Sequence, residues 1–307
     1  MDYHIPVLAE EVLDGLAIRP NGVYVDGTLG GGGHSEKILE KLNENGRCLG
    51  FDVDPDAIAF ASKRLERFGD KFKIVNSNFS FLSEGLYRSG FKSADGILLD
   101  LGVSSRQLDN PEKGFSFRAE ANLDLRLDPS LKLSAADVIN TYSDDQLCKV
   151  IRDYGEEQFA WQITKELVKR RAQKPFVTTT ELTTAIDAVI FPDKRKKSYA
   201  RVFQALRIEV NRELEVLKTA LAKSVSCLAP GGRLVVISYH SLEDRIVKDF
   251  LKYESLSCIC PPQQPICQCG KVATVTLISR KPLVPSEEEC ERNPRSRSAK
   301  LRIAERK

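Results

Sequence analysis

The sequence lacks any apolar run long enough to cross a membrane. Apolar stretches such as Ile97–Leu99 and Leu234–Ile237 are of strand length, far short of the roughly 20 residues that span a bilayer. The first residues, Met1 to Leu8, also lack the basic segment and apolar core of a secretory signal. We therefore expect a cytoplasmic chain with no membrane partner, whose eight cysteines are thiols or metal ligands rather than disulfides.

Strong compositional imbalance is missing as well. Hydrophobic residues make up 42% and charged residues 29% of the 307 residues, which excludes wholesale disorder and fibrous repeats. The net charge of +3 neither demands nor excludes a polyanionic partner. Basic residues gather at 169–171, 194–197 and 292–307, and each cluster is either a solvated face or a phosphate-binding surface.

Short β-rich runs alternate with helical periodicity over the first hundred residues. The alternation predicts strands at Val23–Asp26, Arg47–Asp52, Phe72–Asn76 and Ala94–Asp100, with helices at Ser35–Leu42 and Asp56–Phe68. Such an order indicates right-handed βαβ crossovers and a mostly parallel, doubly wound α/β sheet. Later runs predict a long helix at 199–228, a strand at 233–238, and an antiparallel pair at 272–280 and 300–304.

Between these two α/β parts, the pattern from about Asp109 to Arg201 shows helical stretches and loops without a convincing buried strand. Helices are predicted at 135–140, 143–151, 157–171 and 180–190. We expect an α/β domain in two parts, 1–108 and 202–307, interrupted by an all-helical insertion at 109–201 that recognises substrate. A long insert costs little loop-closure entropy.

A glycine-rich turn follows the first predicted strand. Residues Gly27 to His34 contain five glycines before a helix, and glycines let a ligand lie against the backbone beside the free N–H groups of a helix start. Asp52 ends the next predicted strand, where a carboxylate in a βαβ site accepts ribose hydroxyls. Together these features predict a nucleoside site.

The same turn indicates which nucleoside binds. A dinucleotide fingerprint would start at Gly30 and Gly32 but ends on Ser35 instead of glycine. Asp26 would repel a pyrophosphate but suits the ammonium of a methionine moiety. The methyltransferase pattern [DE]-x-[GA]-x-G-x-G matches Asp26, Gly30 and Gly32, with Thr28 departing from it. S-adenosylmethionine is therefore favoured over a nicotinamide dinucleotide, and an oxidoreductase is the weaker alternative.

Longer motifs lie in order along nearly the whole chain: HIPVL at 4–8, DGTLGGGGHS at 26–35, LLDLGVSSRQLD at 98–109, GFSF at 114–117, LDLRLD at 123–128, YGEE at 154–157, SYHSLEDR at 238–245 and NPRSRS at 293–298. In these motifs the chain resembles the bacterial 16S rRNA cytosine-N4 methyltransferase (MraW) family. The resemblance implies a class I methyltransferase fold, S-adenosyl-L-methionine as cofactor, and methylation of a cytidine N4 at the decoding centre. It also implies 16S rRNA or the small ribosomal subunit as partner.

The resemblance further implies a set of cofactor-binding residues. Phe79 would stack on the adenine, an interaction worth about 1–3 kcal/mol, although a core position would also explain it. His34 could donate to the cofactor or merely cap a helix. The full implied set is Gly32, Gly33, His34, Asp52, Phe79, Asp100 and Gln107.

Catalytic candidates are fewer. Other amino methyltransferases carry Asp/Asn/Ser-Pro-Pro-aromatic after the fourth strand, whereas this chain has Asp100-Leu101-Gly102-Val103. We expect Asp100 to hold the target amino group or the cofactor, and the resemblance favours the cofactor. Asp124 and His240 are further catalytic candidates, although His240 could equally be structural. Three aromatic residues could form a platform for the base: Phe115, Phe117 and Tyr239.

Two interpretations stay open beside the enzyme. The chain could be a ribosome-assembly RNA-binding factor that retains the cofactor fold without turnover. Separately, four thiolates at Cys258, Cys260, Cys267 and Cys269 could bind zinc, but C-x-C is tighter than the usual C-x₂₋₄-C pairs. We expect free buried thiols there and no metal.

Overall fold

The computed structural model describes residues 6–103, 114–116, 120–264 and 266–307. Two compact units make up the chain: Met1–Gly102 with Leu214–Lys307, and Val103–Glu213. The expected insertion limits, 109 and 201, thus lie inside the second unit. No helix among the described residues is long and apolar enough to cross a membrane.

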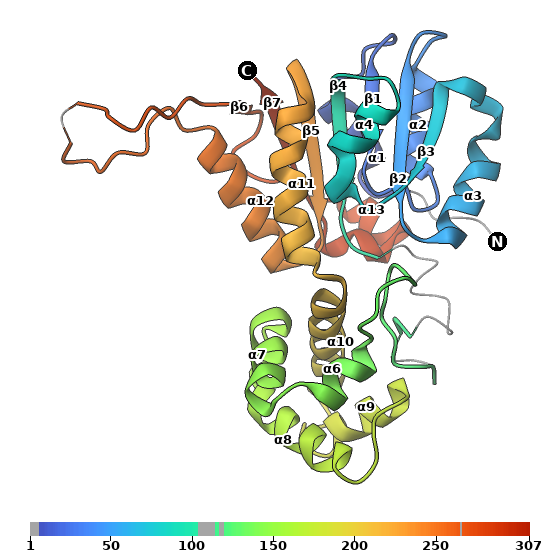
Figure 1. The fold of residues 1–307 in the computed structure, drawn as a ribbon, viewed down its shortest axis with the longest axis vertical. Helices are drawn as coiled ribbons and strands as arrows, with labels where there is room; N and C mark the ends of the chain where they lie inside the picture. The colour runs from blue at the N-terminus through green and yellow to red at the C-terminus, as the bar shows by residue number, and fades with distance from the viewer. Residues whose placement is uncertain (1–5, 104–113, 117–119, 265) are drawn as a thin grey trace. The chain divides into compact units, whose positions relative to one another are not determined.

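The first unit is built on a seven-stranded sheet with the order β3-β2-β1-β4-β5-β7-β6 (Figure 1). Strands β1 to β5 are parallel, β7 is antiparallel to β5, and β6 is antiparallel to β7. This order confirms the doubly wound class I methyltransferase fold, including the expected antiparallel pair near the C-terminus. The strands are β1 Val23–Asp26, β2 Arg47–Asp52, β3 Phe72–Asn76, β4 Ala94–Asp100, β5 Leu228–Ser238, β6 Val275–Leu277 and β7 Lys300–Arg306.

Helices cover both faces of this sheet. Alternate strand residues point to opposite faces, so Ile97 and Leu99 join one hydrophobic cluster with α4, α11 and α12. Leu98 joins another with α1, α2 and α3. The bounds are α1 Ala9–Leu16, α2 Gly33–Lys41, α3 Pro55–Leu65, α4 Leu82–Arg88, α11 Glu213–Cys227, α12 Ser241–Glu254 and α13 Glu287–Arg292.

The second unit packs its helices around a separate hydrophobic cluster. Capping boxes begin three of these helices, with Ser134, Ser143 and Thr178 as the N-caps; such caps satisfy the first free N–H groups of each helix. Helices α7 and α10 approach closely, since a Cβ on Gly155 would lie 2.7 Å from the Arg201 carbonyl oxygen. The helices are α6 Ala135–Thr141, α7 Asp144–Gly155, α8 Ala160–Arg171, α9 Thr179–Asp187 and α10 Arg195–Asn211.

The prediction of one long helix at 199–228 is wrong. Helix α10 ends at Asn211 and α11 begins at Glu213. Arg212 between them has a φ of 50°, and its N–H donates to the carbonyls of Glu209 and Ile208. A left-handed residue that closes such bonds ends a helix. Apolar periodicity is similar on both sides of Arg212, which is why the pattern did not show the break.

Candidate active site

Four segments of the predicted site lie at the carboxyl ends of neighbouring parallel strands. Residues 27–34 follow β1, Asp52 ends β2, Phe79 begins the 3-10 turn Phe79–Phe81 after β3, and Asp100 ends β4. Tyr239 directly follows β5. Ligands of doubly wound sheets bind at this edge, where the strand order reverses. We call residues 27–34, Asp52, Phe79, Asp100 and Tyr239 the strand-end site.

The backbone of the turn requires glycine. Gly30 and Gly32 have φ values of 49° and 75°, which residues with a Cβ rarely adopt. A Cβ on Gly32 would also lie 3.0 Å from Leu65, and one on Gly27 would lie 2.5 Å from Leu99 and 3.3 Å from Phe79. The missing side chains therefore let the turn pack against α3 and lie directly beside Phe79.

Asp26 lies beneath this turn with 1% of its surface exposed. Its carboxylate accepts hydrogen bonds from the Thr28 N–H at 3.1 Å and the Ser35 hydroxyl at 2.7 Å. Burial raises the pKa of the Asp26 carboxyl. These bonds show that Asp26 fixes the turn, and the expectation that it also faces a ligand ammonium stays a prediction.

Asp52 connects β2 to the same turn. Its Oδ2 accepts from the Gly30 N–H at 2.8 Å, and its Oδ1 accepts from the N–H groups of Val53 and Asp54 at 2.8 and 2.9 Å. Burial raises the pKa of Asp52, and these N–H donors oppose that rise. An ionised carboxylate has about four acceptor positions, so Oδ2 keeps one for a ligand hydroxyl.

Asp100 brings together three strand ends. Its backbone N–H donates to the Thr28 hydroxyl at 2.7 Å, and the Tyr239 hydroxyl donates to its Oδ1 at 2.8 Å. Its Oδ2 lies 3.5 Å from His34 Nε2. That nitrogen is buried and has no hydrogen-bond partner among the described residues. Because buried polar atoms are rarely left unpaired, the role of His34 as a donor to the cofactor stays a prediction.

Sequence reasoning missed the contacts that Tyr239 and Thr28 make in this cluster. Tyr239 is predicted as a platform for the base, and its hydroxyl in addition donates to Asp100. Burial, followed by the neighbouring Asp100 charge, raises the pKa of Tyr239 well above 10.0, which keeps the hydroxyl a donor. Thr28, a departure from the motif, supplies the hydroxyl that anchors the end of β4. The signal available in the sequence was the position of Thr28, shortly after Asp26 in the turn that follows the first strand.

Two catalytic candidates have structural partners of their own. His240 is the N-cap of α12, where its Nδ1 accepts from the Glu243 N–H at 3.4 Å and Nε2 lies 3.0 Å from Glu243 Oε1. In the second unit, Asp124 accepts bonds from the Arg126 guanidinium at 2.6 and 2.7 Å, which lower the pKa of Asp124. These contacts are structural, but Nε2 of His240 is also buried without a hydrogen-bond partner among the described residues, so the catalytic roles of His240 and Asp124 stay predictions.

The remaining predicted residues are Phe115, Gln107 and Phe117. Phe115 is buried in the hydrophobic cluster of the second unit, which leaves little of its ring surface to serve as a platform. Gln107 and Phe117 lie outside the described residues.

Comparison with known proteins extends this picture. A ribosomal RNA small subunit methyltransferase H from Caldicellulosiruptor saccharolyticus is 53% identical over 98% of this chain and 98% of its own length. Those from Carboxydothermus hydrogenoformans and Clostridioides difficile are 51% and 49% identical, over 98% and 99% of this chain and 97% and 98% of theirs. Among solved structures, an rRNA methylase from Streptococcus thermophilus aligns over 99% of this chain and 98% of that one, with 12% identity and a TM-score of 0.44.

The last of these likenesses is too distant to add to the fold assignment, which rests on the strand order. The sequence profile of the MraW methylase family, by contrast, matches residues 1–307. With that match and relatives at about half identity over nearly their full length, the chain belongs to the MraW methylase family and is a methyltransferase.

Proposed function

We propose that this protein transfers a methyl group from S-adenosyl-L-methionine to the N4 amino group of a cytidine at the decoding centre of 16S rRNA. The observation that carries the proposal is the convergence of Asp52, Asp100 and His34 at one sheet edge, where Nε2 of His34 has no hydrogen-bond partner among the described residues. Membership of the family supplies the reaction class. A cytoplasmic location belongs to the same proposal, since the substrate is ribosomal.

The strand-end site fits this cofactor. A glycine turn without side chains leaves backbone N–H groups for a ligand, the free position on Asp52 suits a ribose hydroxyl, and the partly exposed Phe79 suits a purine ring. The residues proposed to hold the cofactor are Gly32, Gly33, His34, Asp52, Phe79, Asp100 and Gln107. The bound cofactor supplies an electrophilic methyl on a sulfonium.

The protein's own contribution is mainly positioning. A cytosine amino group is a poor nucleophile, because its lone pair is delocalised into the ring. Alignment of two reactants can lower the activation barrier by about 7–11 kcal/mol. A general base typically raises the rate only about 10²–10⁴-fold. Asp100, fixed by Tyr239 and Thr28, holds the cofactor in line. Asp124 and His240 remain candidates for contact with the target base.

Asp100→Ala tests this assignment. Removing the carboxylate should weaken S-adenosylmethionine binding by about 10- to 100-fold, the effect of losing one charge-assisted hydrogen bond. Turnover on radiolabelled cofactor with naked 16S rRNA or small subunits should fall with it. Isothermal titration measures the affinity, and Asp124→Ala, in the other unit, serves as control. Unchanged affinity in Asp100→Ala would refute the assignment.

Retained cofactor binding without methyl transfer in the wild type would favour an RNA-binding assembly factor instead.

The helical unit is proposed to recognise the RNA. Not every basic residue is available for this: Arg171 donates to the carbonyls of Ile139 and Tyr142, and Arg302 pairs with Asp244. Lys196 and Lys197 on α10, in contrast, are exposed. Phosphate contacts from lysine make binding strongly dependent on salt.

Charge reversal tests that surface. Lys196→Glu/Lys197→Glu should weaken rRNA binding and lower the salt slope by about 1 for each lost contact, with cofactor affinity unchanged. Filter binding at several salt concentrations measures the rRNA affinity and its salt slope. Lys248→Glu/Lys252→Glu, on the exposed side of α12, is the matched control. Equal losses in the two double variants would show a net-charge effect rather than a binding surface.

A further inference from the structure

The segment between α12 and β6, residues 255–274, is long and has no core of its own. We call it the cysteine loop. None of its described residues from 255 to 272 is buried, and Leu256, Ile259, Ile266 and Val272 are exposed apolar side chains. Irregular loops longer than about 12–15 residues are uncommon in compact domains unless they have a function or are disordered. Hydrophobic burial therefore does not explain how this loop keeps one conformation.

The base of the loop is closed by polar contacts. The Thr274 N–H donates to the Glu254 carbonyl at 2.9 Å, its hydroxyl donates to the Glu254 carboxylate, and the Lys271 ammonium lies 3.4 Å from that carboxylate. These bonds join the end of α12 to the start of β6. They leave the outer part of the loop, where the cysteines lie, without support.

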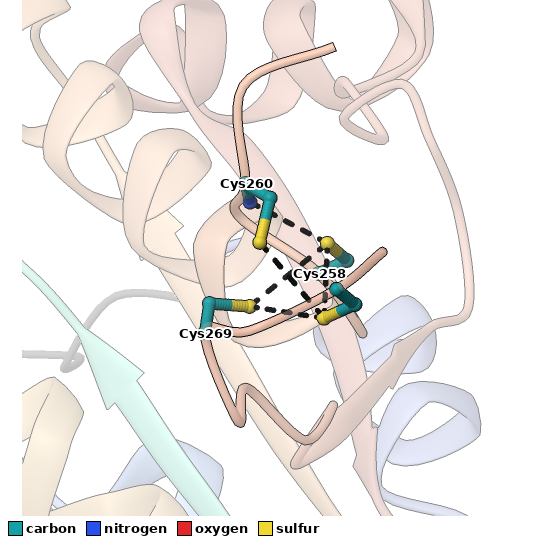
Figure 2. Close-up of side chains that lie close together, drawn as sticks. Cys258, Cys260 and Cys269 are labelled. Carbon is teal, nitrogen blue, oxygen red and sulfur yellow. Dashed lines mark hydrogen bonds between the residues drawn. The ribbon is translucent and has the colours of Figure 1, made fainter. Parts of the chain in front are cut away.

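All four cysteine sulfurs of the loop converge. Figure 2 shows the side chains of Cys258, Cys260 and Cys269 pointing toward one another, and their sulfurs, with that of Cys267, lie within 4.8 Å of one another. The separations are 3.5 Å for 258–267, 3.6 Å for 267–269, 3.9 Å for 260–267 and 3.9 Å for 258–269. A zinc ion about 2.3 Å from each of four tetrahedral sulfurs spaces them about 3.8 Å apart.

Backbone N–H groups also point at three of these sulfurs. The residue between the cysteines of each arm donates its N–H to the last cysteine of the opposite arm: Ile259 to Cys269 at 3.3 Å, and Gln268 to Cys260 at 3.4 Å. The Cys260 N–H donates to Cys258 at 3.4 Å. These bonds link the two arms of the loop to each other, so the convergence of the sulfurs involves the backbone as well as the side chains.

We propose that Cys258, Cys260, Cys267 and Cys269 form a structural zinc site that fixes the cysteine loop. Two disulfides fit the geometry less well, because each would bring one pair of sulfurs to about 2.05 Å and separate the rest. A cluster of several irons would need wider spacing, since iron and sulfide lie between the protein sulfurs. Soft thiolate ligands around one tetrahedral position select zinc. The sequence expectation of free buried thiols is wrong in one respect, since Cys258 and Cys267 are exposed and Cys260 and Cys269 are partly exposed.

Metal content of the full-length protein, purified without chelator, tests the proposal. We expect about one zinc per chain in the wild type and in Cys148→Ser, whose cysteine lies in the other unit. Cys258→Ser/Cys267→Ser removes one ligand from each arm and should lose at least nine-tenths of the zinc. Less than a tenth of a zinc per wild-type chain, or equal zinc in the double variant, would overturn the proposal.

Two further measurements keep the test independent of the folding of the variant. Cobalt added to chelator-treated wild type should produce the intense sulfur-to-metal charge-transfer bands of a tetrahedral thiolate site, and zinc should displace them. Addition of a chelator should make four further thiols react with a thiol reagent, beyond those that react in its absence. Absence of the cobalt bands would overturn the site, as would protected thiols that appear only with a reductant, because these are disulfides.

Discussion

In the strand-end site, polar side chains are fixed by a hydrophobic sheet, whereas in the cysteine loop none of the described residues from 255 to 272 is buried. Asp52 and Asp100 each end a strand of the buried sheet, and backbone N–H groups or the Tyr239 hydroxyl hold their carboxylates. The sheet therefore orders this site before a ligand arrives. Binding then costs little conformational entropy, which is the advantage of preorganisation.

The cysteine loop has the opposite balance. Its described outer residues bury no side chain. The conformational entropy cost of ordering the loop, about 1–2 kcal/mol per residue, is therefore not offset by hydrophobic burial. Small units without a core are commonly stabilised by a metal or by disulfides. Side chains therefore converge for two different reasons in this chain. In the strand-end site a scaffold positions them, whereas in the cysteine loop a ligand would gather them.

The largest expected effect that separates the regions comes from one substitution made in each. Gly32 and Gly270 have similar positive φ values of 75° and 63°, so alanine costs about 1–2 kcal/mol of backbone strain at either. A Cβ on Gly32 would also lie 3.0 Å from Leu65, while one on Gly270 would meet nothing within 4 Å. We expect Gly32→Ala to lower cofactor affinity more than tenfold and Gly270→Ala to leave it unchanged.

Calorimetric titration of both variants measures that contrast, and zinc content shows whether either substitution affects the cysteine loop. Gly270→Ala should bind zinc with at most modest weakening, because space is open around it. If both variants lost cofactor binding equally, a general loss of stability would explain the result, and the packing of the turn on α3 would not be its cause.

The sequence predicted the sheet well because its signals are local. The bounds of β1 to β4 agree with the predicted strands, since short β-branched runs between turns need no tertiary information. Helices α1, α4 and α12 were not predicted. Helix α12 begins with a histidine cap, an unusual N-cap residue, and α4 has seven residues with Gly85 inside it, too few for a clear period.

The site was predictable in position but not in detail. Strand-end rules place Asp52 and Asp100 at one edge, whereas the partners of Asp26 and Tyr239 depend on side-chain distances that no spacing reveals. The cysteines illustrate the same limit. The C-x-C spacing argued against a metal because it is tighter than the usual pairs. The convergence of the sulfurs, however, arises from the pairing of two arms of a loop. Spacing within one arm says nothing about that pairing.

The smallest expected effect sharpens the account of the strand-end site. Tyr239→Phe removes the hydroxyl that donates to Asp100 Oδ1 at 2.8 Å and leaves the carboxylate in place. A neutral-to-charged hydrogen bond is worth about 1.5–3 kcal/mol, but the Asp100 side chain is 22% exposed, so water replaces part of the loss. We expect cofactor affinity to fall about 3- to 10-fold, with zinc content unchanged.

The pH dependence distinguishes this positioning role from proton transfer. Because the pKa of Tyr239 is raised well above 10.0, its hydroxyl stays protonated and keeps donating until the pH passes that raised value. The ratio of wild-type to Tyr239→Phe affinity should therefore stay constant between about pH 6 and 9. Tyr87→Phe, with a side chain 80% exposed on α4, is the matched control. A ratio that changes within this range, or a loss of turnover far larger than the loss of affinity, would mean that Tyr239 acts on the substrate itself rather than through Asp100.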